Sequence, residues 1–159
     1  MKILAIDPAN ELTAYVIVDT DFKIYDKGKV PNSEMLEIIE RNEYDIMAIE
    51  IIVNFGLSGR HLFETSEMIG RCDYANTLNG KTTLRIKRND VKKHFKVKRG
   101  SKQNPVPGAD SQIRTSLINR FGEVGTKASP GYFYKFKEDI WQAMAVLVYT
   151  VDNKLWKEK

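Results

Sequence analysis

Three carboxylic acids of this sequence lie in strongly apolar surroundings, where an unpaired charge is costly. Asp7 follows the run "ILAI", Glu50 stands between "IMAI" and "IIV", and Asp139 opens the hydrophobic segment "DIWQAMAVLVY". Such carboxylates need cations or hydrogen-bond donors as partners. Carboxylate oxygens are also the ligands that Mg2+ prefers, and a pair of such ions can stabilise both oxygens of an in-line phosphoryl displacement. The three acids therefore indicate a candidate metal site for phosphodiester cleavage.

Each acid also has a purely structural interpretation. Asp7 precedes Pro8, and an Asp-Pro pair often begins a turn. Asp139 stands where a helix is expected to begin, so its side chain could cap that helix and interact with the helix dipole. Glu50 is harder to explain in this way, because strands disfavour Glu and apolar strands do so more strongly.

The predicted elements have an order that can bring these acids together. Apolar and β-branched runs predict five strands, over 2–7, 13–19, 22–30, 45–53 and 82–87. Helical spacing predicts five helices, over 31–42, 58–80, 88–95, 108–122 and 137–159. We therefore expect an α/β fold in which a five-stranded mixed sheet carries helices on both faces. Its first three strands should be antiparallel and its later strands joined through helical crossovers. If the first and fourth strands are neighbours, Asp7 and Glu50 lie near the same edge of the sheet.

Composition is typical of one globular domain that spans residues 1–159. Hydrophobic residues make up 42% and charged residues 29% of the chain, and no apolar run approaches the roughly 18 residues of a membrane span. The N-terminal "MKILAIDPAN" does not resemble a signal peptide, because a charge and a proline interrupt it. The single cysteine, Cys72, excludes an intrachain disulfide and favours a reducing, cytoplasmic location.

Positive charge is concentrated in one window of the sequence. Residues 81–120 contain twelve Lys or Arg against two acids, which gives this window a charge of +10 within a chain of net charge +4. The window includes the loop "KVKRGSKQNPVPG", with two glycines and two prolines. A solvated basic face is one explanation. We favour the other, a surface that meets the phosphates of a nucleic acid.

The order and spacing of five segments resemble the RuvC-type Holliday junction resolvases, and the phage-type branch is the most similar. These segments are "MKILAIDPANELTAYVIVD", "YDIMAIEIIV", "KRNDVKKHF", "GADSQIRTSLINRFG" and "KEDIWQAMAVLVY". The resemblance implies a ribonuclease H-like fold and a homodimer that cuts four-way junctions and other branched DNA. It also implies Mg2+ or Mn2+ as cofactor, with two ions in an intact site. If the gene is of phage origin, the location is the cytoplasm of a bacterial host.

Asp7, Glu50 and Asp139 match the family's first-strand aspartate, its fourth-strand glutamate and the first acid of its final D-x-x-D motif. The second acid of that motif falls at Gln142, one helical turn after Asp139. Glutamine can offer a metal a neutral carbonyl oxygen, but it removes one negative charge. The glutamine is compatible with a natural variant, with an engineered inactive form, or with replacement by another carboxylate. Glu138 and Asp110 are the candidates for replacement. Glu138 is the weaker one, because on a helix it points about 100° away from Asp139. For Asp110 we favour the other role, as the cap of the helix that follows it.

The resemblance also implies DNA contacts and a dimer surface. The family stacks an apolar side chain from the loop after the fourth strand on bases at the junction; Val53 and Phe55 are the candidates, and Phe55 is the better platform. The expected phosphate contacts are Arg60, Lys87, Lys98, Arg99 and Lys102. Tyr132, Phe133, Tyr134 and Phe136 either line the DNA channel or pack beneath their loop. The helix over 60–78 is expected to form the homodimer interface through small residues.

Two functions follow from these observations. The first is a metal-dependent endodeoxyribonuclease that resolves junctions, with Asp7, Glu50 and Asp139 as catalytic residues. The second is a junction-binding protein with impaired or lost catalysis, which Gln142 would explain.

Overall fold

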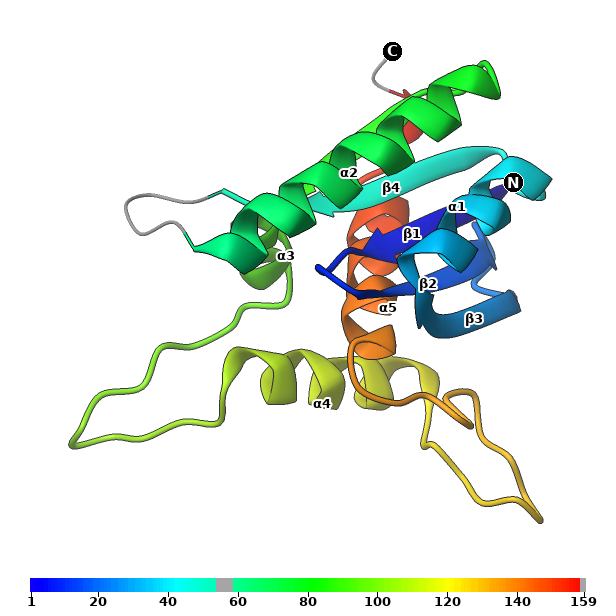
Figure 1. Cartoon of the computed structure of the whole chain (residues 1–159). Coiled ribbons are helices and arrows are strands. Elements are labelled where there is room, and N and C mark those ends of the chain that lie inside the picture. Colours follow the sequence, from blue (N-terminus) through cyan, green and yellow to red (C-terminus); the bar gives the residue numbers. More distant parts are fainter. Residues whose placement is uncertain (54–58, 158–159) are drawn as a thin grey trace.

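The computed structural model describes residues 1–53 and 59–157, and its elements follow the predicted order (Figure 1). The strands are β1 (Lys2–Asp7), β2 (Leu12–Asp19), β3 (Ile24–Pro31), β4 (Ile46–Ile51) and β5 (Thr83–Lys87). The helices are α1 (Asn32–Arg41), α2 (Arg60–Leu78), α3 (Arg88–His94), α4 (Ala109–Phe121), α5 (Ile140–Asp152) and a short 3-10 helix (Leu155–Lys157).

The five strands form one mixed sheet in the order β3-β2-β1-β4-β5. The β1/β2 and β2/β3 pairs are antiparallel, whereas β1/β4 and β4/β5 are parallel. The predicted α/β class and mixed sheet are thus confirmed, as is the pairing of the first strand with the fourth. Ile6 lies opposite Ile49, so Asp7 and Glu50 follow side by side at the carboxyl ends of their strands.

Successive side chains of each strand point to opposite faces of the sheet, and this produces a separate hydrophobic core on each face. Leu4, Ile6, Met47 and Ile49 point toward the face covered by α1 and α2. The residues between them point toward α5, which is buried all round because the sheet covers one side and α3 and α4 cover the other (Figure 1). Within the described part of the chain, none of the helices combines the length and apolar character needed to cross a membrane.

The aromatic segment before α5 is part of the core and fixes the start of that helix. Phe133 and Phe136 are buried, and their ring centroids lie 4.7 and 5.3 Å from that of Trp141. Of the two roles expected for this segment, the structure shows packing. Glu138 then adopts a positive φ of 42°, which is unusual for a residue with a side chain, and the chain enters α5 at Asp139.

Asn32 holds the turn that follows Asp7. Its side-chain amide donates to the carbonyl oxygens of Ala9 and Asn10 at 3.1 and 3.0 Å, and its Oδ1 accepts from the hydroxyl of Thr13 at 2.8 Å. Thr13 is fully buried. The start of α1 therefore fixes the path of the chain immediately after the β1 aspartate.

Replacing Asn32 with Ala should lower the free energy of unfolding by about 2 kcal/mol, because the substitution leaves the buried Thr13 hydroxyl without its acceptor and removes two bonds to the turn. Denaturant unfolding followed by circular dichroism measures this change. Asn153→Ala is the matched control, since the exposed Asn153 makes a single local bond to Tyr149. Equal stability losses in the two variants would contradict the role assigned to Asn32.

Candidate active site

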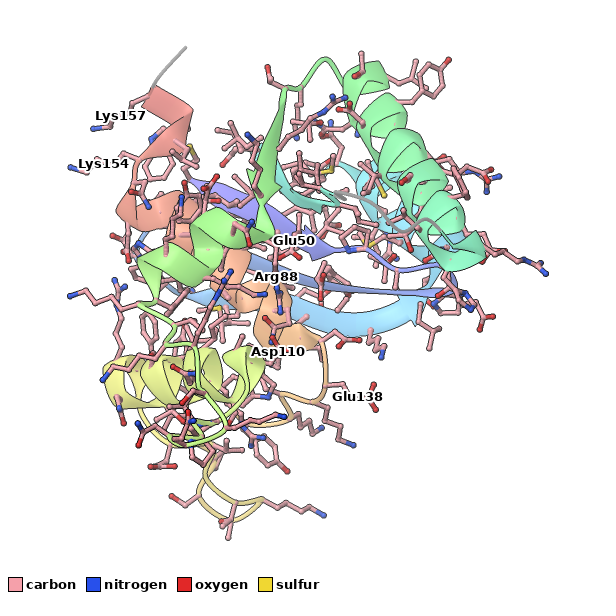
Figure 2. The ribbon with its side chains drawn as sticks, turned by 90° about the vertical axis from the view of Figure 1, so that its left-hand side faces the viewer. Glu50, Arg88, Asp110, Glu138, Lys154 and Lys157 are labelled. Atoms are coloured by element: carbon pink, nitrogen blue, oxygen red, sulfur yellow. The ribbon has the colours of Figure 1, made fainter. Side chains whose placement is uncertain are left out.

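The candidate site lies at the carboxyl ends of β1, β4 and β5, where α4 and α5 approach the sheet. Asp7 ends β1, Glu50 is the penultimate residue of the paired strand β4, and Arg88 begins α3 immediately after β5. Asp139 stands at the N-terminus of α5 and Asp110 in the first turn of α4. Figure 2 shows Arg88 between Glu50, which belongs to the sheet, and Asp110, which belongs to α4.

Arg88 connects three elements of the site through its guanidinium group. Its Nη1 donates to Glu50 Oε2 at 3.2 Å and to Gln142 Oε1 at 2.9 Å, and its Nη2 donates to Asp110 Oδ1. Burial acts to lower the pKa of Arg88, but the adjacent Glu50 and Asp110 carboxylates hold that pKa above its ordinary value. Arg88 therefore stays charged and acts as a fixed cation within the site.

Lys29 of β3 is a second cation at the edge of the site. Its Nζ lies 2.7 Å from Asp139 Oδ2 and 2.6 Å from Glu138 Oε2. Hydrogen bonds to these two carboxylates raise the pKa of Lys29. The Asp139 side chain makes no capping hydrogen bond at the start of α5, so the structure does not give it the capping role that sequence alone allowed.

Asp7 is the carboxyl group with the most perturbed environment. In the described part of the chain, no side-chain hydrogen bond or ion pair reaches its carboxyl oxygens. Burial, followed by the charges of Glu50, Asp139 and Asp110, raises the pKa of Asp7 from 3.8 to about 8, against a smaller opposing effect of Arg88. Burial also raises the pKa of Glu50. The two cations of the site therefore do not fully offset the effects of burial and of neighbouring carboxylates on these two acids.

The oxygen donors of Asp7, Glu50 and Asp139 have the chemistry that Mg2+ or Mn2+ requires, and the positive charge of such an ion would favour the ionised form of Asp7. However, within residues 1–53 and 59–157, no three His, Cys, Asp or Glu side chains form a group that could hold a metal ion as they stand. Instead, oxygens of Glu50 and Asp139 contact Arg88 and Lys29. The donor chemistry fits a divalent ion, whereas the present side-chain positions accommodate organic cations.

The structure gives different surroundings to Glu138 and Asp110, the two acids that could supply the carboxylate missing at position 142. Glu138 is exposed and pairs with Lys29, at the outer edge of the site. Asp110 makes no capping bond in α4 and instead pairs with Arg88, close to the Gln142 amide. Gln142 itself is buried and accepts a hydrogen bond from Arg88.

Most of the predicted DNA-contacting residues lie on exposed surfaces. Lys98 and Arg99 line a cleft of about 750 Å³ between α3 and the start of α4, together with Lys92 and Lys93. Lys87 and Lys102 are exposed as well, whereas Arg60 pairs with Glu64 one helical turn away. Phe55, the expected stacking platform, lies outside the described residues, and the alternative, Val53, is exposed.

Sequence reasoning did not find the roles of Arg88 and Lys29. In the sequence Arg88 is one of twelve basic residues in the window 81–120, and Lys29 lies outside that window. A signal for Arg88 was present, because the residue that follows a strand parallel to β4 lies at the same sheet edge as Glu50. Lys29 had no comparable signal, since its partners are more than 100 residues away in sequence.

Comparison with solved structures shows that the fold is known. The chain aligns with Thermus thermophilus RuvC at a TM-score of 0.67 and 13% identity, over 98% of this chain and 97% of that chain. It aligns with T. thermophilus RuvC in complex with a Holliday junction substrate at a TM-score of 0.65 and 14% identity, over 98% and 96% of the two chains.

A resolvase from a different source gives a similar result. The Fowlpox virus resolvase, in complex with its substrate Holliday junction DNA, aligns at a TM-score of 0.64 and 14% identity, over 98% of this chain and 99% of that chain. This chain shares their ribonuclease H-like fold. No protein-family model and no curated protein matches the sequence.

The raised pKa of Asp7 predicts how the stability of the metal-free protein depends on pH. Between about pH 4 and pH 8 the folded state retains a proton at Asp7 that the unfolded state loses, so this group reduces stability as the pH rises through that window. Asp7→Asn should therefore be more stable than the parent at pH 8, by an amount on the order of 2 kcal/mol or about 4–8 °C in Tm.

Thermal melts in chelator across this pH range measure the effect, and the difference between the two proteins should disappear near pH 4. Asp21→Asn is the control, since Asp21 is exposed and lies in the β2–β3 turn. An Asp7→Asn protein less stable than the parent at pH 8 would contradict the assignment.

Proposed function

We propose that this protein is a metal-dependent endonuclease that cuts four-way DNA junctions. The observation that carries the proposal is the adjacency of Asp7 and Glu50 at the ends of two paired parallel strands, with Asp139 facing them from α5. Two of the similar structures are resolvases bound to Holliday junction DNA, which supports a branched substrate. Other branched DNA is a secondary substrate class in this proposal.

Asp7, Glu50 and Asp139 are the residues that would hold Mg2+ or Mn2+. When bound, such an ion lowers the pKa of a coordinated water and polarises the phosphoryl oxygen. Asp7 is central because the charges of both Glu50 and Asp139 raise its pKa. Its carboxyl makes no bond to either resident cation, so this group is available as a ligand. Glu50 offers its Oε1, since Oε2 is the oxygen that contacts Arg88.

The DNA surface in this proposal is the basic cleft beside the site. Lys98 and Arg99, with Lys92 and Lys93, surround a hollow that opens between α3 and the start of α4. The loop over 95–108 extends well beyond the body of the domain (Figure 1). A concave basic surface next to the acids would hold the phosphate backbone while the acids act on one phosphodiester bond. In this proposal Lys87, Lys102 and Arg60 are further phosphate contacts, and Phe55 or Val53 would stack on the junction bases.

The homodimer in this proposal forms through α2. Phe63, Tyr74 and Leu78 expose 66, 67 and 69% of their surface, on the side of the helix opposite the buried Met68 and Cys72. Gly70 lies between them, and a Cβ added there would meet no atom within 4 Å. An exposed apolar stripe with a small residue at its centre allows close packing against a second copy of the same helix.

The second candidate function is a junction-binding protein without catalysis. Gln142 favours it, because this position carries an amide where the RuvC-type pattern has an acid, and the amide oxygen contacts Arg88. Both functions require the same basic surface and dimer. They differ only in whether the phosphodiester bond is broken.

Incubation of the protein with a synthetic four-way junction and Mn2+ should yield paired, symmetric nicks. Asp7→Asn should reduce the cleavage rate at least 1,000-fold, because it removes the central carboxylate, and should leave junction affinity within about threefold. Denaturing gels measure cleavage and gel shifts measure affinity, with Asp21→Asn as the control that retains activity. Full activity in Asp7→Asn would refute the assigned site, and shifted but uncut junctions with the parent protein would establish the binding-only function.

Tyr74→Glu should convert the protein from dimer to monomer at micromolar concentration, because it places a charge at the centre of the proposed apolar interface. Light scattering coupled to size-exclusion chromatography gives the mass directly. Leu12→Glu provides the matched control, since Leu12 is an exposed apolar residue on β2 and should leave the dimer intact. A monomeric parent protein would show that α2 does not mediate self-association.

A further inference from the structure

We propose that Arg88 takes the place of one of the two divalent ions expected at this site, so that each chain binds a single divalent ion. The inference rests on the proposed function. It differs from the expectation carried by the resemblance, which was two ions in an intact site. It also assigns Arg88 a role at the reaction centre.

The position of Arg88 is fixed by acceptors from three separate elements. Glu50 belongs to β4, Gln142 to α5 and Asp110 to α4, and all three accept hydrogen bonds from the same guanidinium group. The Arg88 side chain is only 26% exposed. The guanidinium group therefore occupies the space between Glu50 and residue 142, where it contacts oxygens of both side chains.

The three acceptors also match a guanidinium better than they match a metal ion. Arg88 presents N–H donors in several directions, so it can bond to well-separated oxygens without drawing them together. Mg2+ would require its ligands about 2 Å from one centre. Among the described residues, the oxygens of Glu50, Gln142 and Asp110 all accept hydrogen bonds from Arg88, and only two of the three are carboxylates.

Gln142 has a direct physical explanation within this arrangement. Its amide oxygen is a neutral acceptor for Arg88 Nη1, and its side chain is buried. The negative charge that balances Arg88 comes from Glu50 on one side and Asp110 on the other. A third full negative charge at position 142 is therefore not required to keep the guanidinium in place. Gln142 is therefore one of the three acceptors that hold Arg88, and it does not mark a metal site that has lost a ligand.

The negative charge that remains is enough for one divalent ion. The site contains five carboxyl groups, Asp7, Glu50, Asp110, Glu138 and Asp139, and two cations, Arg88 and Lys29. Asp7 pairs with neither cation. Arg88 uses three of its five N–H donors on protein acceptors, so two remain for a phosphate oxygen of DNA. A guanidinium directed at a phosphate is an established way to stabilise the charge of phosphoryl transfer.

A structural ion pair is the competing explanation of the same contacts, and the number of bound ions distinguishes the two. Mn2+ is titrated into the DNA-free protein up to millimolar concentration, and unbound Mn2+ is followed by electron paramagnetic resonance. The parent protein should bind one ion per chain. Combining Arg88→Gln with Gln142→Asp removes the cation and restores an acid, and this double variant should bind two.

Two single variants test whether Arg88 itself contributes to cleavage. Arg88→Gln alone should bind its first Mn2+ at least tenfold more tightly, because a positive charge next to the ligands is removed, yet should cut junctions at least tenfold more slowly at saturating Mn2+. Removing an Arg88 that only pairs with Glu50 and Asp110 would also tighten metal binding, but it would leave the cleavage rate at saturating Mn2+ unchanged. Arg85→Gln is the matched control; Arg85 pairs with Asp73 and should change neither quantity.

Two ions bound to the parent protein would overturn the inference and leave the proposed nuclease intact. The same conclusion would follow if the double variant, shown by thermal unfolding to be folded, still bound one ion. If the parent protein bound no ion and cut no junction, the proposed function would fail, and the inference with it.

Discussion

The parallel pairing of β1 with β4 is the constraint on which the site depends. It places two carboxyl groups, Asp7 and Glu50, side by side at the end of a buried sheet, where water screens their repulsion less than at an open surface. A fold can tolerate this arrangement by protonating an acid, by supplying cations or by binding a metal. The raised pKa of Asp7 reflects the first response, and the contacts of Arg88 and Lys29 the second. The third is the response on which the proposed activity would depend.

The packing of the other elements holds the sheet edge in place against the repulsion between its carboxyl groups. The apolar α5 packs against the sheet along its length and brings Asp139 and Gln142 to the strand ends. Phe133 and Phe136 pack on Trp141 in the first turn of α5 and so hold that turn in place. Because these contacts are distributed through the core, the charged groups do not have to stabilise the fold by themselves. The burial around α5 offsets the electrostatic cost at its N-terminus.

Much of the fold could be predicted from the sequence, because the signals were local. Short apolar runs predicted β1 and β4, and Glu50 was conspicuous because no apolar strand favours a glutamate. The partners of the acids could not be predicted in the same way. Lys29 and Asp139 are distant in sequence, and Asp110 has the same local context whether it caps α4 or binds Arg88. Only the three-dimensional arrangement of the helices distinguishes these alternatives.

Gln142 shows why a missing acid has to be interpreted together with its neighbours. Seen in sequence, it removes a charge from a metal site and favours lost catalysis. Seen in the structure, it accepts a hydrogen bond from Arg88, which also contacts Glu50 and Asp110, so the local balance of charge is maintained by different means. A guanidinium differs from a divalent ion in that it carries one charge, remains bound without exchange, and directs its donors within a plane. A site built around it would keep its electrostatic support at metal concentrations too low to fill two ion sites.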